Sequence, residues 1–178
     1  TYKRMKVSMG KLIVGDSGIE KKTQDVLRRL KGGATKAIGM IQKDDPNFRI
    51  HNAKKQDFYD LRKKLPFELH QYFYAAIFNH EITQNAFLEL SNSNYDINKI
   101  FNLINAHQDI LDKKLNNTPN DMIRMMNAAK DAGAKATKIV GSGGGGCFLA
   151  MSDPKDEKKV LNSILNAGAV DAFTVNLI

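Results

Sequence analysis

The stretch TKIVGSGGGGCFLAM, residues 137–151, joins two short apolar runs through a loop made almost entirely of glycine. The flanking runs, Lys135–Val140 and Gly146–Met151, are rich in β-branched and apolar residues and are predicted to be strands. A flexible linker would separate domains, whereas this loop has a strand on each side. A hairpin turn needs only one or two glycines. The excess of glycine favours a backbone approach site, where main-chain N–H groups converge on an anion; close packing of the loop against a helix is the alternative.

The glycine loop does not match the common phosphate-binding motifs. Residues 141–147 contain no lysine, and they lead into a strand rather than a helix. Both GxxxxGK[ST] and the dinucleotide fingerprint GxGxxG require a helix after the glycines. A Walker-type site is therefore excluded.

The chain before the loop begins with β structure and continues with helices. Lys3–Val7 alternates in polarity, Lys11–Val14 is a candidate buried strand, and Gly15–Gly18 has the residues of a turn. Thr23 is a candidate N-cap for a helix that ends before Asp44-Asp45-Pro46 and that Gly32-Gly33 could break or kink.

Four more helices are expected before the glycine loop. After a short helix near Leu65, Pro66 begins a long helix that carries His80 on its apolar stripe. The helix over residues 97–115 places Gln108 in phase with apolar residues, so this amide needs a hydrogen-bond partner. Thr118-Pro119 then predicts the capped start of a further helix, and Gly133 predicts the end of that helix.

A further helix from Asp153-Pro154 to Gly168 and a last strand over Val170–Leu177 complete the predicted order. That order is strand, helices, helix, strand, strand, helix, strand. It predicts an α+β fold, a ferredoxin-like sandwich with helices inserted in the first crossover. The 178 residues are enough for one such domain and not for a second.

Composition limits the classes of function. The net charge of +8 comes from basic pairs scattered along the chain rather than from one cluster, so nucleic acid is not the expected partner, and small anionic substrates suit the same charge. No apolar run is long enough to span a membrane. The single cysteine fits a reducing cytoplasm. The first residues lack an initiator methionine and the apolar block of a signal peptide, which suggests a piece of a longer protein.

Few side chains are candidates for chemistry. His80-Glu81 begins an HExxH-like pattern, but Gln84 occupies the position of the second histidine, and no zinc or other metal is expected. His80 is then a core or cleft residue. Cys147 has no evident base nearby and is expected to be a small buried thiol. Asp16 and Ser17 sit in a turn from which they could reach a cleft, although a turn without function is equally compatible.

The glycine loop, together with Gly133–Val140 before it, resembles the C-terminal motif of the GHMP kinases, the superfamily that includes galactokinase and mevalonate kinase. The turn Ile13–Gly18 resembles the segment that opens the C-terminal half of those kinases. Asn105–Gln108 followed by Thr118-Pro119 also has a counterpart there. The resemblance extends from about Leu12 to Leu177.

The resemblance implies one half of an ATP- and Mg-dependent kinase. The chain contains neither the Pro-x-x-x-Gly-Leu-Gly-Ser-Ser-Ala loop that holds ATP in this family nor the aspartate base of its N-terminal domain. It therefore implies an N-terminal ATP-binding domain as partner, no catalytic residue within 1–178, and an inactive isolated domain with an exposed, mobile loop. The residues implied to approach the phosphates or the substrate are Asp16, Ser17, Gly18, Gly141, Ser142, Gly143, Gly144 and Gly145, with His80 and Gln108 as possible cleft residues.

Two kinds of small molecule remain as candidate acceptors of the phosphoryl group. The layout from Leu65-Pro66 to His80-Glu81 resembles galactokinase and favours a sugar. Gly143–Gly146 and the turn at Gly15–Ile19 resemble mevalonate or phosphomevalonate kinase. A non-catalytic RNA- or anion-binding module is the alternative of another class, although RNA-binding sheets display stacking aromatics and here only Phe148 and Phe173 lie on strands outside Tyr2.

Overall fold

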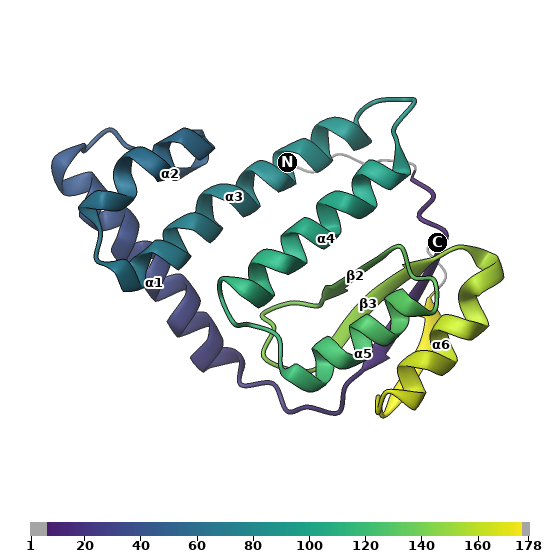
Figure 1. The fold of residues 1–178 in the computed structure, drawn as a ribbon. Helices are drawn as coiled ribbons and strands as arrows, with labels where there is room; N and C mark the ends of the chain where they lie inside the picture. The colour runs from purple at the N-terminus through teal and green to yellow at the C-terminus, as the bar shows by residue number, and fades with distance from the viewer. Residues whose placement is uncertain (1–6, 176–178) are drawn as a thin grey trace.

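The computed structural model describes residues 7–175. The described chain folds into a four-stranded sheet and a set of helices (Figure 1). In chain order the elements are β1 (Lys11–Asp16), α1 (Thr23–Asp44), η1 (Ile50–Asn52), α2 (Lys55–Leu61), η2 (Arg62–Lys64), α3 (Phe67–Leu90), α4 (Ile97–Lys113), α5 (Asn120–Asp131), β2 (Ala136–Ile139), β3 (Cys147–Ser152), η3 (Pro154–Asp156), α6 (Glu157–Asn166) and β4 (Asp171–Val175).

The sheet has the strand order β2-β3-β1-β4, and each neighbouring pair is antiparallel. This is the order of a ferredoxin-like sandwich, and α1 to α4 all lie in the connection from β1 to β2. The predicted fold class is confirmed. The register places Asp16 opposite Cys147 on β3 and opposite Asp171 on β4, so the turn after β1 lies beside the end of the glycine loop.

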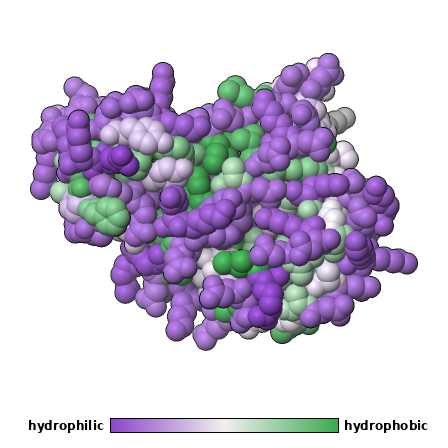
Figure 2. All heavy atoms as spheres, viewed as in Figure 1, coloured by the Kyte–Doolittle hydropathy of each residue, from purple (hydrophilic) through white to green (hydrophobic). Residues whose placement is uncertain are grey.

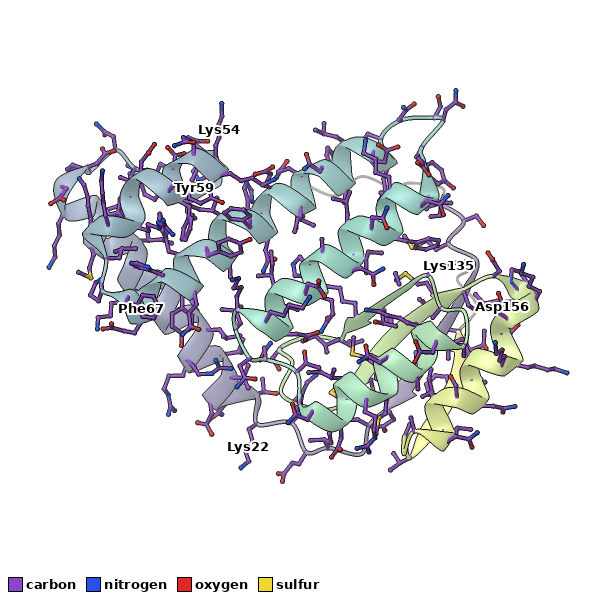
Figure 3. All side chains as sticks on the ribbon, viewed as in Figure 1. Lys22, Lys54, Tyr59, Phe67, Lys135 and Asp156 are labelled. Atoms are coloured by element: carbon purple, nitrogen blue, oxygen red, sulfur yellow. The ribbon has the colours of Figure 1, made fainter. Side chains whose placement is uncertain are left out.

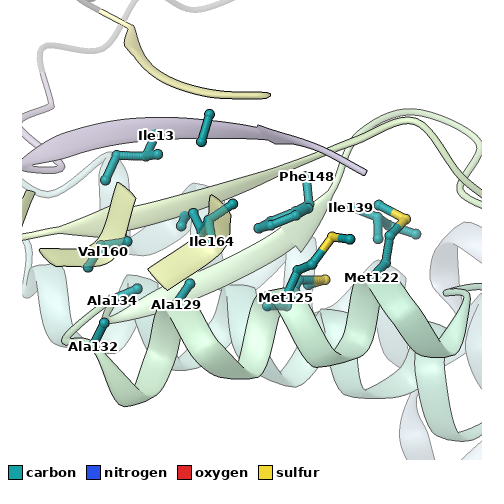
Figure 4. Close-up of a cluster of buried hydrophobic side chains, with 13 residues drawn as sticks. Ile13, Met122, Met125, Ala129, Ala132, Ala134, Ile139, Phe148, Val160 and Ile164 are labelled. Carbon is teal, nitrogen blue, oxygen red and sulfur yellow. The ribbon is translucent and has the colours of Figure 1, made fainter. Parts of the chain in front are cut away.

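The main core lies between the sheet and the helices α5 and α6 (Figure 4). Met122, Met125 and Ala129 point from α5 toward Phe148 on β3, while Val160 and Ile164 come from α6. The alternation of β strands sends one set of side chains to this face, which is why Phe148 is fully buried. Burial of these apolar groups fixes the register of the sheet.

A second core holds the inserted helices together. Its buried members come from α1, α2, α3, α4 and the intervening loops, among them Ala37, Phe58, Phe73 and Ile110. Leu111 on α4 packs against both this core and the main one, so α4 links the two layers.

Several predicted helix and strand boundaries differ from the structure. α1 begins at Thr23 itself, with Lys22 as N-cap and no side-chain cap, and it runs through Gly32-Gly33 unbroken, with Gly33 packed on Tyr72. α5 has Pro119 rather than Thr118 as its N-cap. β1 continues through Gly15 and Asp16. The alternating run at Lys3–Val7 lies almost wholly outside the described residues.

Within residues 7–175, no helix is both long and apolar enough to cross a membrane.

Candidate functional site

The glycine loop is hydrogen-bonded to two other segments. The N–H of Gly144 donates to the carbonyl of Asn117 (2.8 Å), and the N–H of Gly146 donates to the carbonyl of Ile19 (2.9 Å). The carbonyl of Gly146 accepts from both the N–H (3.1 Å) and the hydroxyl (2.6 Å) of Ser17. The loop, the turn after β1 and the start of the α5 connection therefore form one unit.

The glycines are required by this packing. Gly141 and Gly143–Gly146 all have positive φ, a backbone angle that residues other than glycine rarely adopt. A Cβ on Gly145 would lie 2.7 Å from the carbonyl oxygen of Ile19, and a Cβ on Gly143 would lie 2.3 Å from the side-chain nitrogen of Asn117. Close packing, the alternative interpretation of the glycine run, is therefore present in the structure.

The glycine loop and the turn after β1, which were expected to be exposed, are exposed only in part. Gly143 and Gly145 are buried, and Ser17 is only 5% exposed, because the turn after β1 and Asn117 cover them. Gly141 is exposed, and Ser142 and Gly144 are half-buried. The accessible part of the loop is thus its first turn.

Part of the loop backbone retains free donors. Within residues 7–175, the N–H groups of Gly141, Ser142, Gly143 and Gly145 have no hydrogen-bond acceptor. Successive N–H groups in left-handed or turn conformations form concavities that bind anions. The loop therefore combines a fixed position with unused donors.

Polar side chains from the segment before α1 surround the first turn of the loop. Lys21 donates through Nζ to the carbonyl of Val140 (2.9 Å), next to Gly141. The hydroxyl of Ser142 lies 3.4 Å from the hydroxyl of Thr23. Lys22 is exposed at the same end of the molecule (Figure 3). Basic and hydroxyl groups here would complement an anionic ligand.

Sequence reasoning did not assign Lys21, Thr23 or Asn117 to the site. The sequence predicts Thr23 to be a helix cap, and Lys21 and Asn117 belong to no recognised motif. Asn117 donates through Nδ2 to the carbonyl of Ser142 (2.9 Å) and accepts from Gly144, so it supports the loop from beneath. Asn116 before it has φ of 46°, an uncommon value for a non-glycine residue, which marks a tight connection to α5.

The residues of the turn after β1 stabilise each other. Asp16 accepts through Oδ1 from the N–H of Gly18 (3.0 Å), and the hydroxyl of Ser17 accepts from the N–H of Ile19 (3.2 Å). These bonds hold the turn in place beside Gly146. Cys147, opposite Asp16, is half-buried, and burial together with the Asp16 carboxylate raises the pKa of its thiol, which favours the protonated, unreactive form.

The structure does not bring His80 and Gln108 together. His80, on α3, forms a hydrogen bond through Nε2 with the carbonyl of His51 in η1 (3.0 Å). Gln108, only 1% exposed, donates to Asp112 (2.7 Å) and Thr118 (3.0 Å) and accepts from the N–H of Ile139 (3.0 Å). These bonds connect α4 to Thr118, just before α5, and to strand β2. The hydrogen-bond partner expected for the Gln108 amide is therefore present.

Thr118 also donates a hydrogen bond to Asp112, so its hydroxyl serves this buried network rather than capping α5. No group of three or more His, Cys, Asp or Glu side chains in the described part of the chain is arranged to hold a metal ion.

One protein family matches part of the chain. Residues 85–170, which include α4, α5, the glycine loop and α6, match the family described as GHMP kinases, C terminal. The match covers just under half of the chain, and over these residues the chain is similar to the C-terminal domain of the GHMP kinases. A search of curated proteins finds no match to the sequence.

Solved structures share the fold of this chain. The galactokinase of Lactococcus lactis complexed with galactose superposes with a TM-score of 0.80 at 16% identity, over 96% of this chain and 45% of that protein. The mevalonate kinase of L. major in complex with R-mevalonate gives a TM-score of 0.60 at 15% identity, over 92% of this chain and 41% of that protein. The mevalonate kinase of Staphylococcus aureus MRSA252 gives 0.55 at 15% identity, over 98% and 44%. The chain thus spans less than half the length of each of these proteins.

Proposed function

We propose that residues 1–178 form a single C-terminal domain of an ATP-dependent small-molecule kinase, which acts together with an N-terminal ATP-binding domain. The glycine loop carries this proposal. It is anchored through Gly144 and Gly146, yet Gly141 and Ser142 keep unused N–H groups on its accessible turn. Fixed donors of this kind stabilise negative charge that develops during phosphoryl transfer.

Each part of the site has a role in the proposed reaction. Gly141, Ser142 and Gly143–Gly145 form one wall near the transferred phosphate, and Lys21 adds positive charge beside Gly141. Asp16, Ser17 and Gly18 lie at the substrate edge, where their mutual hydrogen bonds hold the turn. ATP and Mg would be bound mainly by the N-terminal domain. The charge of +8 suits anionic ligands.

We favour a galactokinase-like sugar kinase. The higher TM-score, 0.80 for the galactokinase against 0.60 for the L. major mevalonate kinase, supports this choice. Mevalonate or phosphomevalonate is the second candidate acceptor, because four successive glycines, Gly143–Gly146, and the turn Gly15–Ile19 resemble the mevalonate kinases.

The structure offers little support for an RNA-binding module. Phe148 is fully buried against α5 and α6, which leaves Phe173, 47% exposed on β4, as the aromatic available on the strands of the described sheet. Single-stranded RNA recognition by a sheet needs two or three stacking platforms.

The test is a kinase assay on residues 1–178 joined to their N-terminal domain. ADP release is measured with Mg and ATP plus galactose, mevalonate or phosphomevalonate, and one acceptor is expected to be turned over. Gly141→Asn should lower kcat at least tenfold, because asparagine tolerates positive φ but its side chain occupies the accessible turn. Gly168→Asn, the same change at a helix end with positive φ, is the control. Absence of ATP binding and of turnover with every acceptor would refute the proposal.

A further inference from the structure

A groove separates α3 from α4, away from the glycine loop. It consists of two adjoining hollows of about 210 Å³ and 520 Å³, which share Ile82 and Leu103. Ala86 and Ile104 line the smaller hollow, and Phe78 is among the residues that line the larger one. Hydrophobic side chains are visible on the surface between these helices (Figure 2). We refer to the two hollows together as the α3–α4 groove.

Lys138 lies at the smaller hollow, at one end of the groove. Its neighbours on β2, Thr137 and Ile139, are buried on the opposite face of the sheet, so the alternation of the strand directs Lys138 toward α4. No carboxylate in residues 7–175 lies within salt-bridge distance of Lys138. Burial lowers the pKa of this ammonium group, and the more distant carboxylate of Asp112 opposes the shift.

His107 on α4 lines the same hollow. Its Nδ1 atom is buried and has no hydrogen-bond partner within the described residues. Burial, followed by the charge of Lys138, lowers the pKa of the imidazole to about 4, so the ring is neutral at pH 7. A neutral imidazole can donate one hydrogen bond.

From this geometry we infer that the α3–α4 groove binds an aliphatic monocarboxylate, with its carboxylate at Lys138 and His107 and its hydrocarbon chain along Leu103 and Ile82. One ammonium group and one neutral donor match a single negative charge on two oxygens. The remaining lining of the smaller hollow is almost wholly apolar and matches an alkyl chain. The inference does not depend on the proposed kinase activity, because the groove lies apart from the glycine loop.

Binding of octanoate to the purified protein, followed by calorimetry, tests this inference. Octanoate is expected to bind, and octanamide, which has the same chain without the charge, at least tenfold more weakly. From hexanoate to octanoate the affinity should rise by up to about fourfold per methylene, since each buried methylene contributes about 0.8 kcal/mol. Equal affinity for octanoate and octanamide, or no binding of octanoate, would overturn the inference.

Two variants separate the carboxylate site from the chain site. Lys138→Gln should weaken octanoate binding at least tenfold, whereas Lys135→Gln, which removes an exposed lysine three residues earlier (Figure 3), should leave it unchanged. Ala86→Phe fills the smaller hollow and should abolish the gain in affinity with chain length while retaining Lys138. Thermal unfolding verifies that each variant is folded. Equal losses in the Lys138 and Lys135 variants would contradict the assignment.

Discussion

At the scale of single residues, the buried amide of Gln108 connects three segments of the chain. Gln108→Ala removes its bonds to Asp112 and Thr118 and leaves the N–H of Ile139 without an acceptor inside the core. We expect a loss of about 2–3 kcal/mol in the free energy of unfolding, because a buried unsatisfied donor retains its desolvation cost. Urea denaturation measures this, with Gln71→Ala on the exposed face of α3 as control. A loss no larger than that of the control would contradict the role of Gln108.

His107 should make stability depend on pH. Its pKa in the folded protein is about 4, against about 6.5 in an unfolded chain, because burial and Lys138 disfavour the charged ring. Between these values the unfolded state binds more protons than the folded state, so stability falls as the pH drops from about 6.5 to about 4. His107→Gln should reduce the slope of the unfolding free energy against pH in this range by the contribution of up to one proton. His51→Gln, at an exposed site, should leave this slope unchanged. Equal slopes for His107→Gln and the wild type would count against the burial of the imidazole.

At the scale of secondary-structure elements, the sequence predicts the positions of β1 to β4 to within a few residues, because their signals are local. The helix starts at Thr23 and Thr118 were misassigned for a different reason. The hydroxyl of Thr118 is taken by Asp112 and Gln108 on α4, six and ten residues earlier in the chain, rather than by the backbone of α5. In the same way, the partner of Gln108 could not be predicted, since Ile139 lies 31 residues away in the sequence. Side-chain contacts made between packed elements thus override local capping propensity.

The same long-range packing predicts how the glycine loop responds to substitution. Gly145→Ala places a Cβ 2.7 Å and 2.8 Å from the carbonyl oxygens of Ile19 and Glu20, at a φ of +143°. We expect a loss of at least about 2 kcal/mol in the free energy of unfolding, from backbone strain and lost hydrogen bonds. Gly32→Ala, inside α1 with no atom within 4 Å of the new Cβ, should instead stabilise the protein by about 0.5–1 kcal/mol. Chemical denaturation of both variants measures the difference, and a neutral Gly145→Ala would mean that the loop is not held by the turn after β1.

At the scale of the whole molecule, these residues supply only one wall of the proposed kinase site. The loop and the turn after β1 provide backbone donors, Lys21 and hydroxyl groups, whereas the chain has no ATP-binding loop of the family type and spans 45% of the length of the L. lactis galactokinase. Phosphoryl transfer requires the nucleotide, Mg and acceptor to be positioned together. We therefore expect purified residues 1–178 to show no ADP release with Mg and ATP, with or without galactose or mevalonate. Joining the N-terminal domain should produce turnover, and Gly141→Asn in that longer protein should reduce it. Turnover by residues 1–178 alone, unchanged by Gly141→Asn, would show that catalysis needs neither a second domain nor this loop.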